Sequence, residues 1–372
     1  MKVFIVAGAR PNFMKIAPIY RASLAHPSVE CKIVHTGQHY DREMSDAFFE
    51  ELDIPKPAYF LEAGSGTHAV QTAKIMVAFE PICEREKPDL VIVVGDVNST
   101  LACSIVAKKL CIKVAHVEAG LRSFDLTMPE EINRMVTDAI SDYFFVTEES
   151  GSANLLKEGK HQDSIYFVGH VMVDNLLHQA RKIGDGTIDT STLTVYSLKQ
   201  QKKKYIFMTL HRPSNVDNAS TFRGIISALN EISESLPVLF PVHPRTRKRA
   251  EEFGIQFSNQ IILLPPLGFT DSLYLWKDAE AVFTDSGGLQ EETTALGVPC
   301  VTIRENTERP ITVARGTNVL AGTMREGILS AYRESLKKKT RAAVPPKWDG
   351  QASERIWSIL MGLAKNDSSK RG

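Results

Sequence analysis

Short apolar runs alternate with helix-length amphipathic segments along the whole chain, and this alternation limits the fold more than any other feature. The runs are rich in Val, Ile, Leu and Phe, a pattern typical of strands buried on both faces of a parallel sheet. Six runs lie at residues 3–7, 32–35, 90–94, 114–117, 143–146 and 165–168, and six more at 205–209, 238–242, 261–264, 281–284, 300–303 and 319–321. The sequence therefore predicts an α/β protein with two doubly wound, Rossmann-like halves.

The length of the chain permits two hydrophobic cores, since it has 372 residues of which 43% are hydrophobic. A polar stretch around residues 181–204 separates the two sets of runs, and residues 182–194 lack helical periodicity. We expect an N-terminal domain over 1–180, a linker over 181–200 and a C-terminal domain over 201–350. Residues 351–372 are expected to form a helix that packs back toward the N-terminal domain, with a disordered tail.

Charge and cysteine content exclude several classes of protein. The formal net charge is +0, so nothing indicates a nucleic-acid or membrane-surface binder. The five cysteines are scattered without a C-x-x-C pair, which is typical of a reduced cytoplasmic protein. No apolar stretch approaches the ~20 residues that span a bilayer, and the N-terminus is interpreted as a first strand, not as a signal sequence.

Ligands of open α/β sheets bind beyond the carboxyl ends of the strands. In both halves, polar residues and glycines follow the apolar runs at these ends. The segments are Gly8-Ala9-Arg10-Pro11, Gly37-Gln38-His39, Gly95-Asp96, Glu118-Ala119-Gly120, His211-Arg212, His243-Pro244 and Ser286-Gly287-Gly288. Two halves that each present such residues predict two Rossmann-like domains with a cleft between them, the arrangement called GT-B.

The segment Thr284-Asp285-Ser286-Gly287-Gly288-Leu289-Gln290-Glu291-Glu292 follows an apolar run and opens a helical pattern. Such a turn directs backbone N–H groups and a helix N-terminus at one point, which suits a phosphate. Glu291 and Glu292, one turn further on, could accept hydrogen bonds from ribose hydroxyls. The alternative is an ordinary strand–turn–helix corner whose glycines only allow close packing. We favour a nucleotide diphosphate site.

Carboxylates end two runs that are expected to be neighbouring strands. Asp96 and Glu118 stand there with little flanking positive charge, and converging carboxylates can divide acid and base roles between them. Glu130 and Glu131 open a helix, where interaction with the helix dipole alone accounts for acidic residues.

Cations and histidines complete the set of candidates. Arg10 and Lys15 lie where they could meet phosphate oxygens, although each alone is an ordinary surface cation. His211 and His243 end the first two strands of the second half and are candidates for function, whereas His39 and His116 are interpreted as structural. No histidine spacing supports a metal site, and the absence of G-x-G-x-x-G gives no support for a bound dinucleotide cofactor.

Together and in this order, the segments resemble the non-hydrolysing UDP-N-acetylglucosamine 2-epimerase family over nearly the whole chain. The resemblance rests on the strand-end segments above and on His116-Val117-Glu118-Ala119-Gly120-Leu121-Arg122, Pro129-Glu130-Glu131-x-Asn133-Arg134, Thr209-x-His211-Arg212, Pro241-Val242-His243 and Thr307-Glu308-Arg309-Pro310.

The resemblance implies a GT-B fold, a homodimer, no cofactor, and interconversion of UDP-GlcNAc and UDP-ManNAc for surface polysaccharide synthesis. By motif position, substrate binding and catalysis fall to Arg10, Lys15, Asp96, Glu118 and His211, with Glu130 as a third active-site acid. UDP binding falls to Ser286, Gly287, Gly288, Glu292 and Arg309, and to the backbone of Leu267 at the uracil.

The residue inventory fits a route that begins at the anomeric carbon. Direct removal of the C2 proton is too slow without an adjacent carbonyl, and a redox route would need a bound nicotinamide. The remaining route breaks the anomeric C–O bond, and a carboxylate then removes the C2 proton. The resemblance implies that this step gives 2-acetamidoglucal, and UDP adds back after a proton arrives on the opposite face. Arg10 and Arg309, with His211 as a further candidate, would stabilise departing UDP, and either Asp96 or Glu118 is the main base.

The chain departs from many relatives after His211-Arg212. Pro213-Ser214-Asn215 stands where those relatives carry Arg-Glu-Asn. In the family that second Arg belongs to an allosteric UDP-GlcNAc site, so we expect hyperbolic rather than sigmoidal kinetics.

Three alternative functions remain open. The first loop also occurs in relatives that act on UDP-2,3-diacetamido uronic acids, so the same epimerisation of such a sugar is one alternative. A retaining GT-B glycosyltransferase shares the fold and a UDP site. A hydrolysing epimerase would release free ManNAc and UDP.

Overall fold

The structure is a computed structural model and describes residues 1–37, 48–338 and 340–369. The chain forms two compact units: unit 1 comprises Met1–Asn175 with Pro346–Gly372, and unit 2 comprises Leu176–Pro345. Residues 181–200, which we expected to form a linker, carry the end of α7 (Val171–Gly184), the 3-10 helix η2 (Thr190–Thr192) and most of α8 (Tyr196–Gln201). The expected domain limits stay a prediction.

Unit 1 contains a seven-stranded parallel sheet with the order β3-β2-β1-β4-β5-β6-β7. The order reverses between β1 and β4, so the sheet is doubly wound. All six runs predicted in the first half are strands, and the prediction missed β3, whose two residues are too few to give a pattern. The strands are β1 (Lys2–Ala7), β2 (Glu30–His35), β3 (Tyr59–Phe60), β4 (Leu90–Val94), β5 (Lys113–Val117), β6 (Tyr143–Val146) and β7 (Ile165–Phe167).

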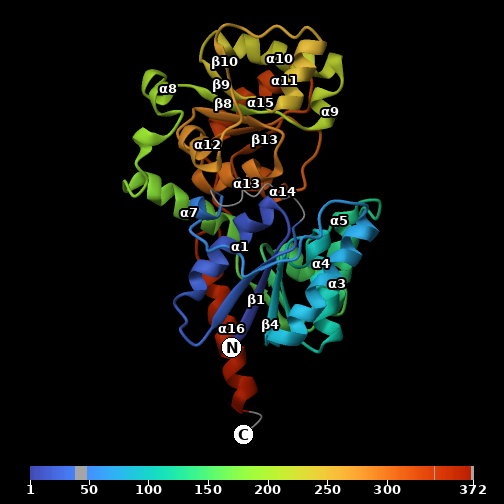
Figure 1. The fold of residues 1–372 in the computed structure, drawn as a ribbon. Coiled ribbons are helices and arrows are strands. Elements are labelled where there is room, and N and C mark those ends of the chain that lie inside the picture. The colour runs from blue at the N-terminus through green and yellow to red at the C-terminus, as the bar shows by residue number, and fades with distance from the viewer. Residues whose placement is uncertain (38–47, 339, 370–372) are drawn as a thin grey trace. The chain divides into compact units, whose positions relative to one another are not determined.

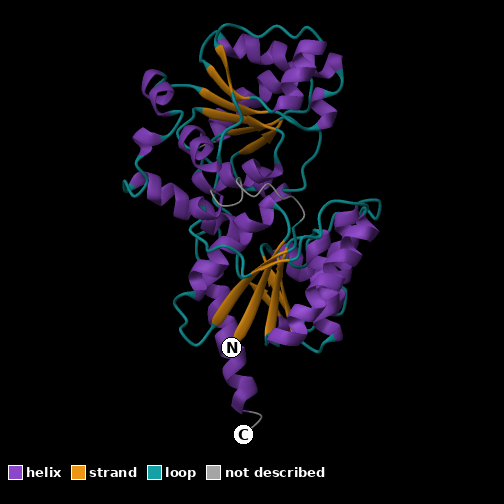
Figure 2. Cartoon of the chain, viewed as in Figure 1, coloured by secondary structure: helices purple, strands orange, loops and turns teal. Residues whose placement is uncertain are grey.

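Helices cover both faces of this sheet (Figures 1 and 2). They are α1 (Arg10–Ser23), α3 (His68–Glu86), α4 (Asn98–Lys109), α5 (Pro129–Ile140), α6 (Glu149–Lys157), the first residues of α7, and α16 (Ala352–Ser369); the 3-10 helix η1 (Gln162–Ser164) precedes β7. Buried side chains of β1, β4 and β5 form a core with α3 and α4.

The C-terminal helix α16 is part of unit 1. The indole nitrogen of Trp357 donates to the carbonyl oxygen of Ile19 in α1 at 2.7 Å, and Trp357 is fully buried. The carboxylate of Asp174 accepts from the amides of Ala352 and Ser353 at 3.1 and 2.7 Å. Asp174 therefore caps the N-terminus of α16 from a distant part of the chain.

Unit 2 contains a six-stranded parallel sheet with the order β10-β9-β8-β11-β12-β13. Its strands are β8 (Ile206–Thr209), β9 (Val238–Pro241), β10 (Ile261–Leu264), β11 (Ala281–Thr284), β12 (Cys300–Thr302) and β13 (Asn318–Leu320). Its helices, besides α8, are α9 (Pro213–Val216), α10 (Ala219–Ser233), α11 (Pro244–Glu252), α12 (Phe269–Trp276), α13 (Gly287–Leu296), α14 (Pro310–Ala314) and α15 (Arg325–Lys338).

The two faces of the unit 2 sheet pack against separate cores. Ile206 and Met208 of β8 belong to one core, and Phe207 between them belongs to the other. An uninterrupted apolar run is therefore required here, because both faces of the strand are buried. The predicted α/β class with two doubly wound units is confirmed. Across the described ranges, no helix has the length and apolar character needed to cross a bilayer.

Candidate active site

The carboxyl ends of β1, β4 and β5 bring α1 and two strand tips together in unit 1. The Lys15 ammonium forms an ion pair with Oε2 of Glu118, and both side chains are largely buried, at 12% and 6% exposed. Gly95 passes beneath this pair with φ +66°, and a Cβ there would lie 2.9 Å from Lys15 Nζ. The turn after β4 thus needs glycine for its conformation and for the space that the ion pair occupies.

Glu118 has a left-handed backbone, with φ 71°. For a residue other than glycine this conformation costs roughly 1–2 kcal/mol. The amides of Glu118 and Ala119 both donate to the carbonyl oxygen of Phe145, at 3.0 and 3.2 Å, which holds the turn in place. The turn places the carboxylate of Glu118 against Lys15 of α1.

Asp96 is paired with an arginine of α5. Arg134 donates from Nε and a terminal nitrogen to Oδ2 of Asp96 at 3.0 and 2.7 Å. Its other terminal nitrogen donates to Oε2 of Glu131 at 2.6 Å. Asp96 remains 31% exposed, whereas Glu131 is buried behind the arginine.

Glu131 is held as an anion within the protein. Burial alone would raise the pKa of its carboxyl, but hydrogen bonds from the amides of Ser123 and Phe124 and from Arg134 outweigh burial and lower it. The adjacent Glu130, predicted as a third acid, is exposed on the first turn of α5. Sequence reasoning missed the partnership of Glu131 with Arg134, for which the i, i+3 spacing on a helix was the available signal.

Asp285 binds backbone and side-chain groups at the carboxyl edge of the unit 2 sheet. Its carboxylate is fully buried and accepts from the amides of His211 and Arg212, at 3.0 and 2.8 Å, and from the side chain of Asn215 at 3.1 Å. Its Oδ1 lies 2.9 Å from Nδ1 of His211, whose ring is 49% exposed. Burial alone would raise the pKa of Asp285, but the hydrogen bond and charge of His211 outweigh it, so that pKa is lowered.

The imidazole of His211 is thereby oriented by a buried carboxylate on Nδ1. Such an arrangement fixes the ring and favours a proton on Nδ1, so that Nε2 is the nitrogen that can meet a ligand. Sequence reasoning named His211 but missed Asp285 as its partner, although Asp285 stands in the quoted glycine-turn motif.

Within the described part of the chain, the start of α13 leaves room for a phosphate. Ser286 is the N-cap residue, but its hydroxyl makes no capping bond. Among the described residues, a Cβ built at Gly287 meets no atom within 4 Å. Close packing therefore does not explain Gly287, and the space above the first turn favours the ligand interpretation of this residue.

Charged residues follow one turn further along α13. Nε of Arg309 lies 2.7 Å from Oε1 of the buried Glu291. Burial, with a smaller contribution from the charge of Glu291, raises the pKa of Glu292 to about 8. The loop that carries Arg309 is tied to α13, because Thr307 donates to Oε1 of Gln290 at 2.6 Å and accepts from the amide of Arg309 at 2.9 Å.

The structure shows the surroundings of two further predicted residues, His243 and Leu267, whereas Arg10 and His39 lie wholly or partly outside the described residues. His243 is an exposed N-cap of α11 and accepts from the amide of Arg245 at 3.3 Å. Leu267 is half-buried and packs against a core of unit 2. The side chain of Arg10 and the whole of His39 lie outside the described residues.

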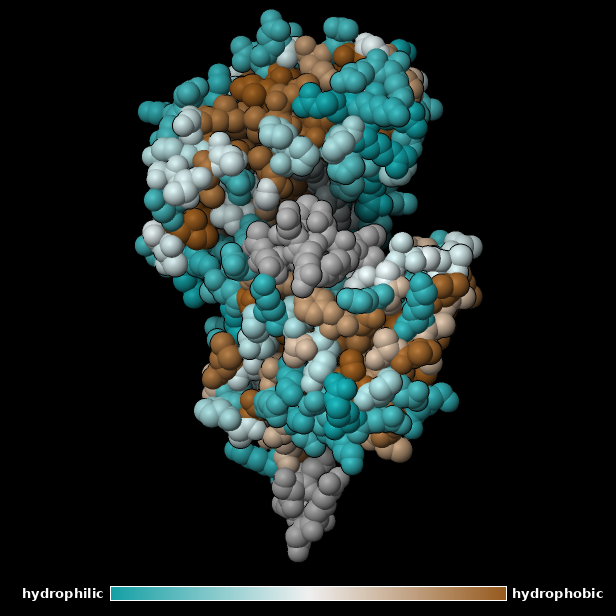
Figure 3. Space-filling view, in the orientation of Figure 1, coloured by the Kyte–Doolittle hydropathy of each residue, from teal (hydrophilic) through white to brown (hydrophobic). Residues whose placement is uncertain are grey.

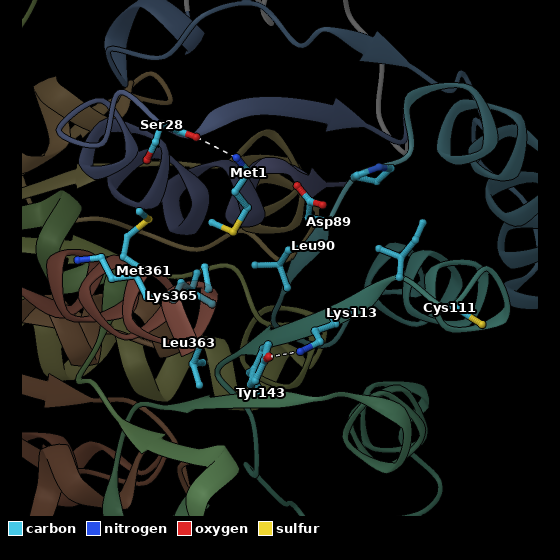
Figure 4. Close-up of a pocket in the computed structure, with 14 residues that line it drawn as sticks. Met1, Ser28, Asp89, Leu90, Cys111, Lys113, Tyr143, Met361, Leu363 and Lys365 are labelled. Carbon is cyan, nitrogen blue, oxygen red and sulfur yellow. Dashed lines mark hydrogen bonds between the residues drawn. The ribbon is translucent and has the colours of Figure 1, made fainter. Parts of the chain in front are cut away.

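A pocket of unit 1 lies elsewhere, at the amino edge of its sheet. Its lining includes the first residues of β4, β5 and β6, which are Leu90, Lys113 and Tyr143, and residues of α16 such as Met361 (Figure 4). No candidate residue lines it, so we place the site at the carboxyl edge instead. In the ranges that the structure describes, no group of three or more His, Cys, Asp or Glu side chains could hold a metal ion.

Two doubly wound parallel sheets, each with polar side chains at the carboxyl ends of its strands, define a protein of the GT-B class. Comparison with known proteins identifies the family. A family model described as UDP-N-acetylglucosamine 2-epimerase matches residues 21–361. The UDP-N-acetylglucosamine 2-epimerase of Methanocaldococcus jannaschii is 44% identical over 366 residues, which are 97% of this chain and 99% of that protein.

Further relatives agree with this match. The UDP-2,3-diacetamido-2,3-dideoxy-D-glucuronate 2-epimerase of Pseudomonas aeruginosa is 41% identical over 366 residues, covering 98% of this chain and 100% of that protein. The crystal structure of the M. jannaschii enzyme in complex with UDP-GlcNAc and UDP has a TM-score of 0.82 at 43% identity, covering 97% of this chain and 99% of that one. The Neisseria meningitidis enzyme bound to UDP-GlcNAc has a TM-score of 0.85 at 30% identity, covering 97% and 100%. The chain belongs to the UDP-N-acetylglucosamine 2-epimerase family, which confirms the resemblance found in the sequence and makes the protein an isomerase.

Proposed function

We propose that this protein is a non-hydrolysing epimerase that inverts C2 of UDP-GlcNAc to give UDP-ManNAc. The chain belongs to a family named for this activity, and one observation on its structure carries the proposal. Two carboxylates, each paired with a cation, lie at the tips of neighbouring strands: Glu118 with Lys15, and Asp96 with Arg134. Inversion at C2 needs one group to remove a proton and a second source to return one on the opposite face. Two carboxylates on adjacent strands suit that requirement.

Unit 2 supplies the groups that suit UDP. The amides of Gly287 and Gly288 and the hydroxyl of Ser286 would bind the diphosphate at the start of α13, and Arg309 and His211 would stabilise its charge as the anomeric C–O bond breaks. Glu292 would bind the ribose and the backbone of Leu267 the uracil, with His243 and Arg10 as further binding residues. The reaction needs no redox cofactor, because the elimination of UDP itself activates the C2 proton.

The decisive experiment is incubation with UDP-GlcNAc in deuterium oxide, followed by proton NMR. Deuterium entering at C2 while UDP-ManNAc appears supports the proposal. Free UDP with free sugar would indicate hydrolysis instead, and transfer of the sugar to an added acceptor would indicate a glycosyltransferase. No change with this substrate would exclude UDP-GlcNAc.

A second candidate substrate is a UDP-2,3-diacetamido uronic acid, because the P. aeruginosa relative named for that sugar is 41% identical over nearly the whole chain. The chemistry at C2 would be the same. The two candidates are separated by kcat/KM for each sugar under the same conditions. A ratio that favours the uronate would overturn the assignment to UDP-GlcNAc but not the epimerisation.

We also propose a homodimer that uses the outer face of α5. This helix buries its polar residues Glu131, Asn133 and Asp138 and exposes Ile132, Met135 and Val136, at 43%, 41% and 37%. A surface helix normally has the opposite arrangement.

The exposed apolar surface continues beyond α5. Phe124 and Leu126 of the preceding loop are 78% and 64% exposed, and Figure 3 shows hydrophobic residues on the surface in this part of unit 1. An apolar stripe of this kind marks a surface that another protein covers. A second copy of the chain, which carries the same stripe, is the partner we propose.

We propose that the enzyme acts in the cytoplasm. All five cysteines are free, including the exposed Cys111, which fits a reducing compartment.

A further inference from the structure

A buried ion pair lies beneath the strand tips of unit 1, outside the residues assigned above. Nδ1 of His116, in β5, is 2.6 Å from Oδ1 of Asp138, in α5, and both side chains are fully buried. Buried charges are expensive unless paired and hydrogen-bonded. A pair in this position therefore needs a reason beyond packing.

The hydrogen bonds of His116 define its charge. Its Nδ1 faces a carboxylate, and its Nε2 lies 2.9 Å from the carbonyl oxygen of Gly95. A carbonyl oxygen can only accept. Oδ2 of Asp138 accepts from the amide of Gly120 at 3.0 Å and forms an ion pair with Arg122 at 2.8 Å. Burial would raise the pKa of Asp138, but the charges of His116 and Arg122 outweigh burial and lower it, so its carboxyl is ionised. With Asp138 ionised, both ring nitrogens of His116 donate, so the ring is an imidazolium cation.

His35, at the tip of β2, provides a contrast within the same unit. It is almost fully buried, but its Nδ1 accepts from the amide of Gly37 at 2.7 Å, so that nitrogen carries no proton. Burial lowers the pKa of His35 to about 4. Burial likewise lowers the pKa of His116, but the charge and hydrogen bond of Asp138 outweigh it and that pKa is raised.

The pair fixes the backbone from which both candidate bases project. His116 holds the carbonyl of Gly95, the residue before Asp96. Asp138 holds the amide of Gly120, two residues after Glu118, and Gly120 has φ +76°. Arg122, on the other side of Asp138, is itself paired with Glu158 at 2.6 Å.

We propose that His116 and Asp138 are positioning residues of the epimerase, a permanently charged pair that sets the geometry of Asp96 and Glu118. The role in catalysis rests on the proposed function, whereas the charge of His116 does not. Neither side chain touches the substrate, because both are fully buried. The positive charge of the imidazolium also interacts with the negative charge of Glu118.

The charge of His116 is tested by NMR of the full chain labelled with ¹⁵N-histidine. At about pH 7, where an ordinary histidine has lost most of its protons, we expect His116 to show the signals of an imidazolium and His35 those of a neutral ring. The variants Asp138→Asn and His35→Gln assign the signals, because the first should shift those of His116 and the second should remove those of His35. A neutral His116 at about pH 7 would overturn the proposal, and this result does not depend on any variant being active.

The positioning role is tested by the kinetics of Asp138→Asn, with Asp142→Asn as the matched control. Asp142 holds the opposite end of β5, where it accepts from the amide of Val114 at 2.7 Å and pairs with Lys108 at 2.8 Å. We expect kcat to fall about 100-fold in Asp138→Asn, since small displacements of catalytic groups have effects of this size. KM for UDP-GlcNAc should change little, and kcat of Asp142→Asn should stay near that of wild type.

The control distinguishes positioning from a loss of stability. If kcat of Asp138→Asn falls no further than kcat of Asp142→Asn, or if only KM changes in Asp138→Asn, the pair is structural and the proposal is wrong. If the wild-type protein exchanges no C2 proton at all, the proposed function fails instead, and the spectrum still decides the charge of His116.

Discussion

At the scale of single residues, Glu118 combines two costly properties in one place. Its backbone is left-handed, and its carboxylate is 6% exposed and paired with Lys15. Strain of this kind persists only where the surrounding structure enforces it, and it is concentrated at functional sites. Asp96, held by Arg134 but 31% exposed, is the less confined of the two acids.

Replacing either acid by its amide should slow the reaction while keeping the shape of the side chain. We expect Glu118→Gln and Asp96→Asn each to lower the rate of deuterium incorporation at C2 by about 10²- to 10⁴-fold, the usual contribution of a general acid or base. The rates are measured by proton NMR in deuterium oxide. If both variants retained the wild-type rate, the assignment of the base to these two residues would be wrong.

Glu292 gives the protein a pH-dependent stability. Its pKa rises from 4.5 to about 8 in the folded protein. Between these values the folded state holds a proton that the unfolded chain has lost, so the free energy of unfolding falls as pH rises, by at most about 1.4 kcal/mol per pH unit.

Glu292→Gln should remove this dependence. We expect its melting temperature to exceed that of wild type by more at about pH 8 than at about pH 5, because only the wild type loses stability in between. Glu234→Gln, a change at an exposed glutamate of the same unit, is the control and should follow the wild type. If the melting temperatures of Glu292→Gln and wild type changed with pH in parallel, the raised pKa of Glu292 would be contradicted.

The sequence predicted the acids and His211 at the strand tips, because a strand end is recognisable from local pattern. It did not predict their partners. Arg134 lies 38 residues from Asp96, and Asp285 lies 74 from His211. Such pairs depend on sheet order and helix rotation, which a single sequence does not display.

At the scale of elements, α5 is an unusual surface helix, since its polar side faces inward. The same helix carries Arg134 to Asp96 and Asp138 to His116. Its periodicity alone would predict the apolar face to be buried in its own core. The strand tips require polar partners instead, so the apolar residues are left on the outside.

A charge on the outer face of α5 should therefore break the dimer. We expect Ile132→Glu to convert a dimer into a monomer in sedimentation equilibrium, because a carboxylate would have to be desolvated in the interface. Met324→Glu, at an apolar residue of unit 2 that is 70% exposed, should leave the dimer intact. A monomeric wild type, or a dimeric Ile132→Glu, would contradict the proposed interface.

The short helix α9 begins at Pro213, where many relatives are expected to carry an arginine. Its Asn215 is buried and bonded to Asp285 and to the carbonyl oxygen of Ile303 at 3.1 and 2.9 Å. We expect initial rates to depend hyperbolically on the UDP-GlcNAc concentration. Added UDP-GlcNAc should not activate the reverse reaction, and strong activation in that assay would refute this prediction.

At the scale of the whole molecule, the alternation of apolar runs sufficed to predict both sheets. Twelve runs became twelve strands, because each was long and apolar enough to be buried on both faces. The exceptions have physical causes: β3 has two residues, and the end of α7 together with α8 lies in a segment too polar to show a helical period. A C-terminal helix packing toward the N-terminal domain is expected from the sequence, but the contacts that hold it, such as that of Trp357 with Ile19, are not visible in any local pattern.

The connectivity of the units can be tested by dissection. Unit 2 is one continuous stretch, so we expect the fragment 176–345 to fold alone, with cooperative thermal unfolding by circular dichroism. The fragment 1–175 lacks α16, which leaves the apolar surface under Trp357 exposed, and should aggregate or melt without cooperativity. A stable, cooperative 1–175 fragment would contradict the structural role of α16.

In the sequence, unit 2 lies between the two segments of unit 1. This connectivity sets the order in which the two units are completed during synthesis. Unit 2 is complete once Pro345 has left the ribosome, whereas unit 1 must wait for α16, which follows unit 2 in the chain. Unit 1, whose synthesis begins before that of unit 2, is therefore completed after it. Until α16 has emerged, the apolar surface that it will cover stays exposed, and we expect a chaperone to bind there.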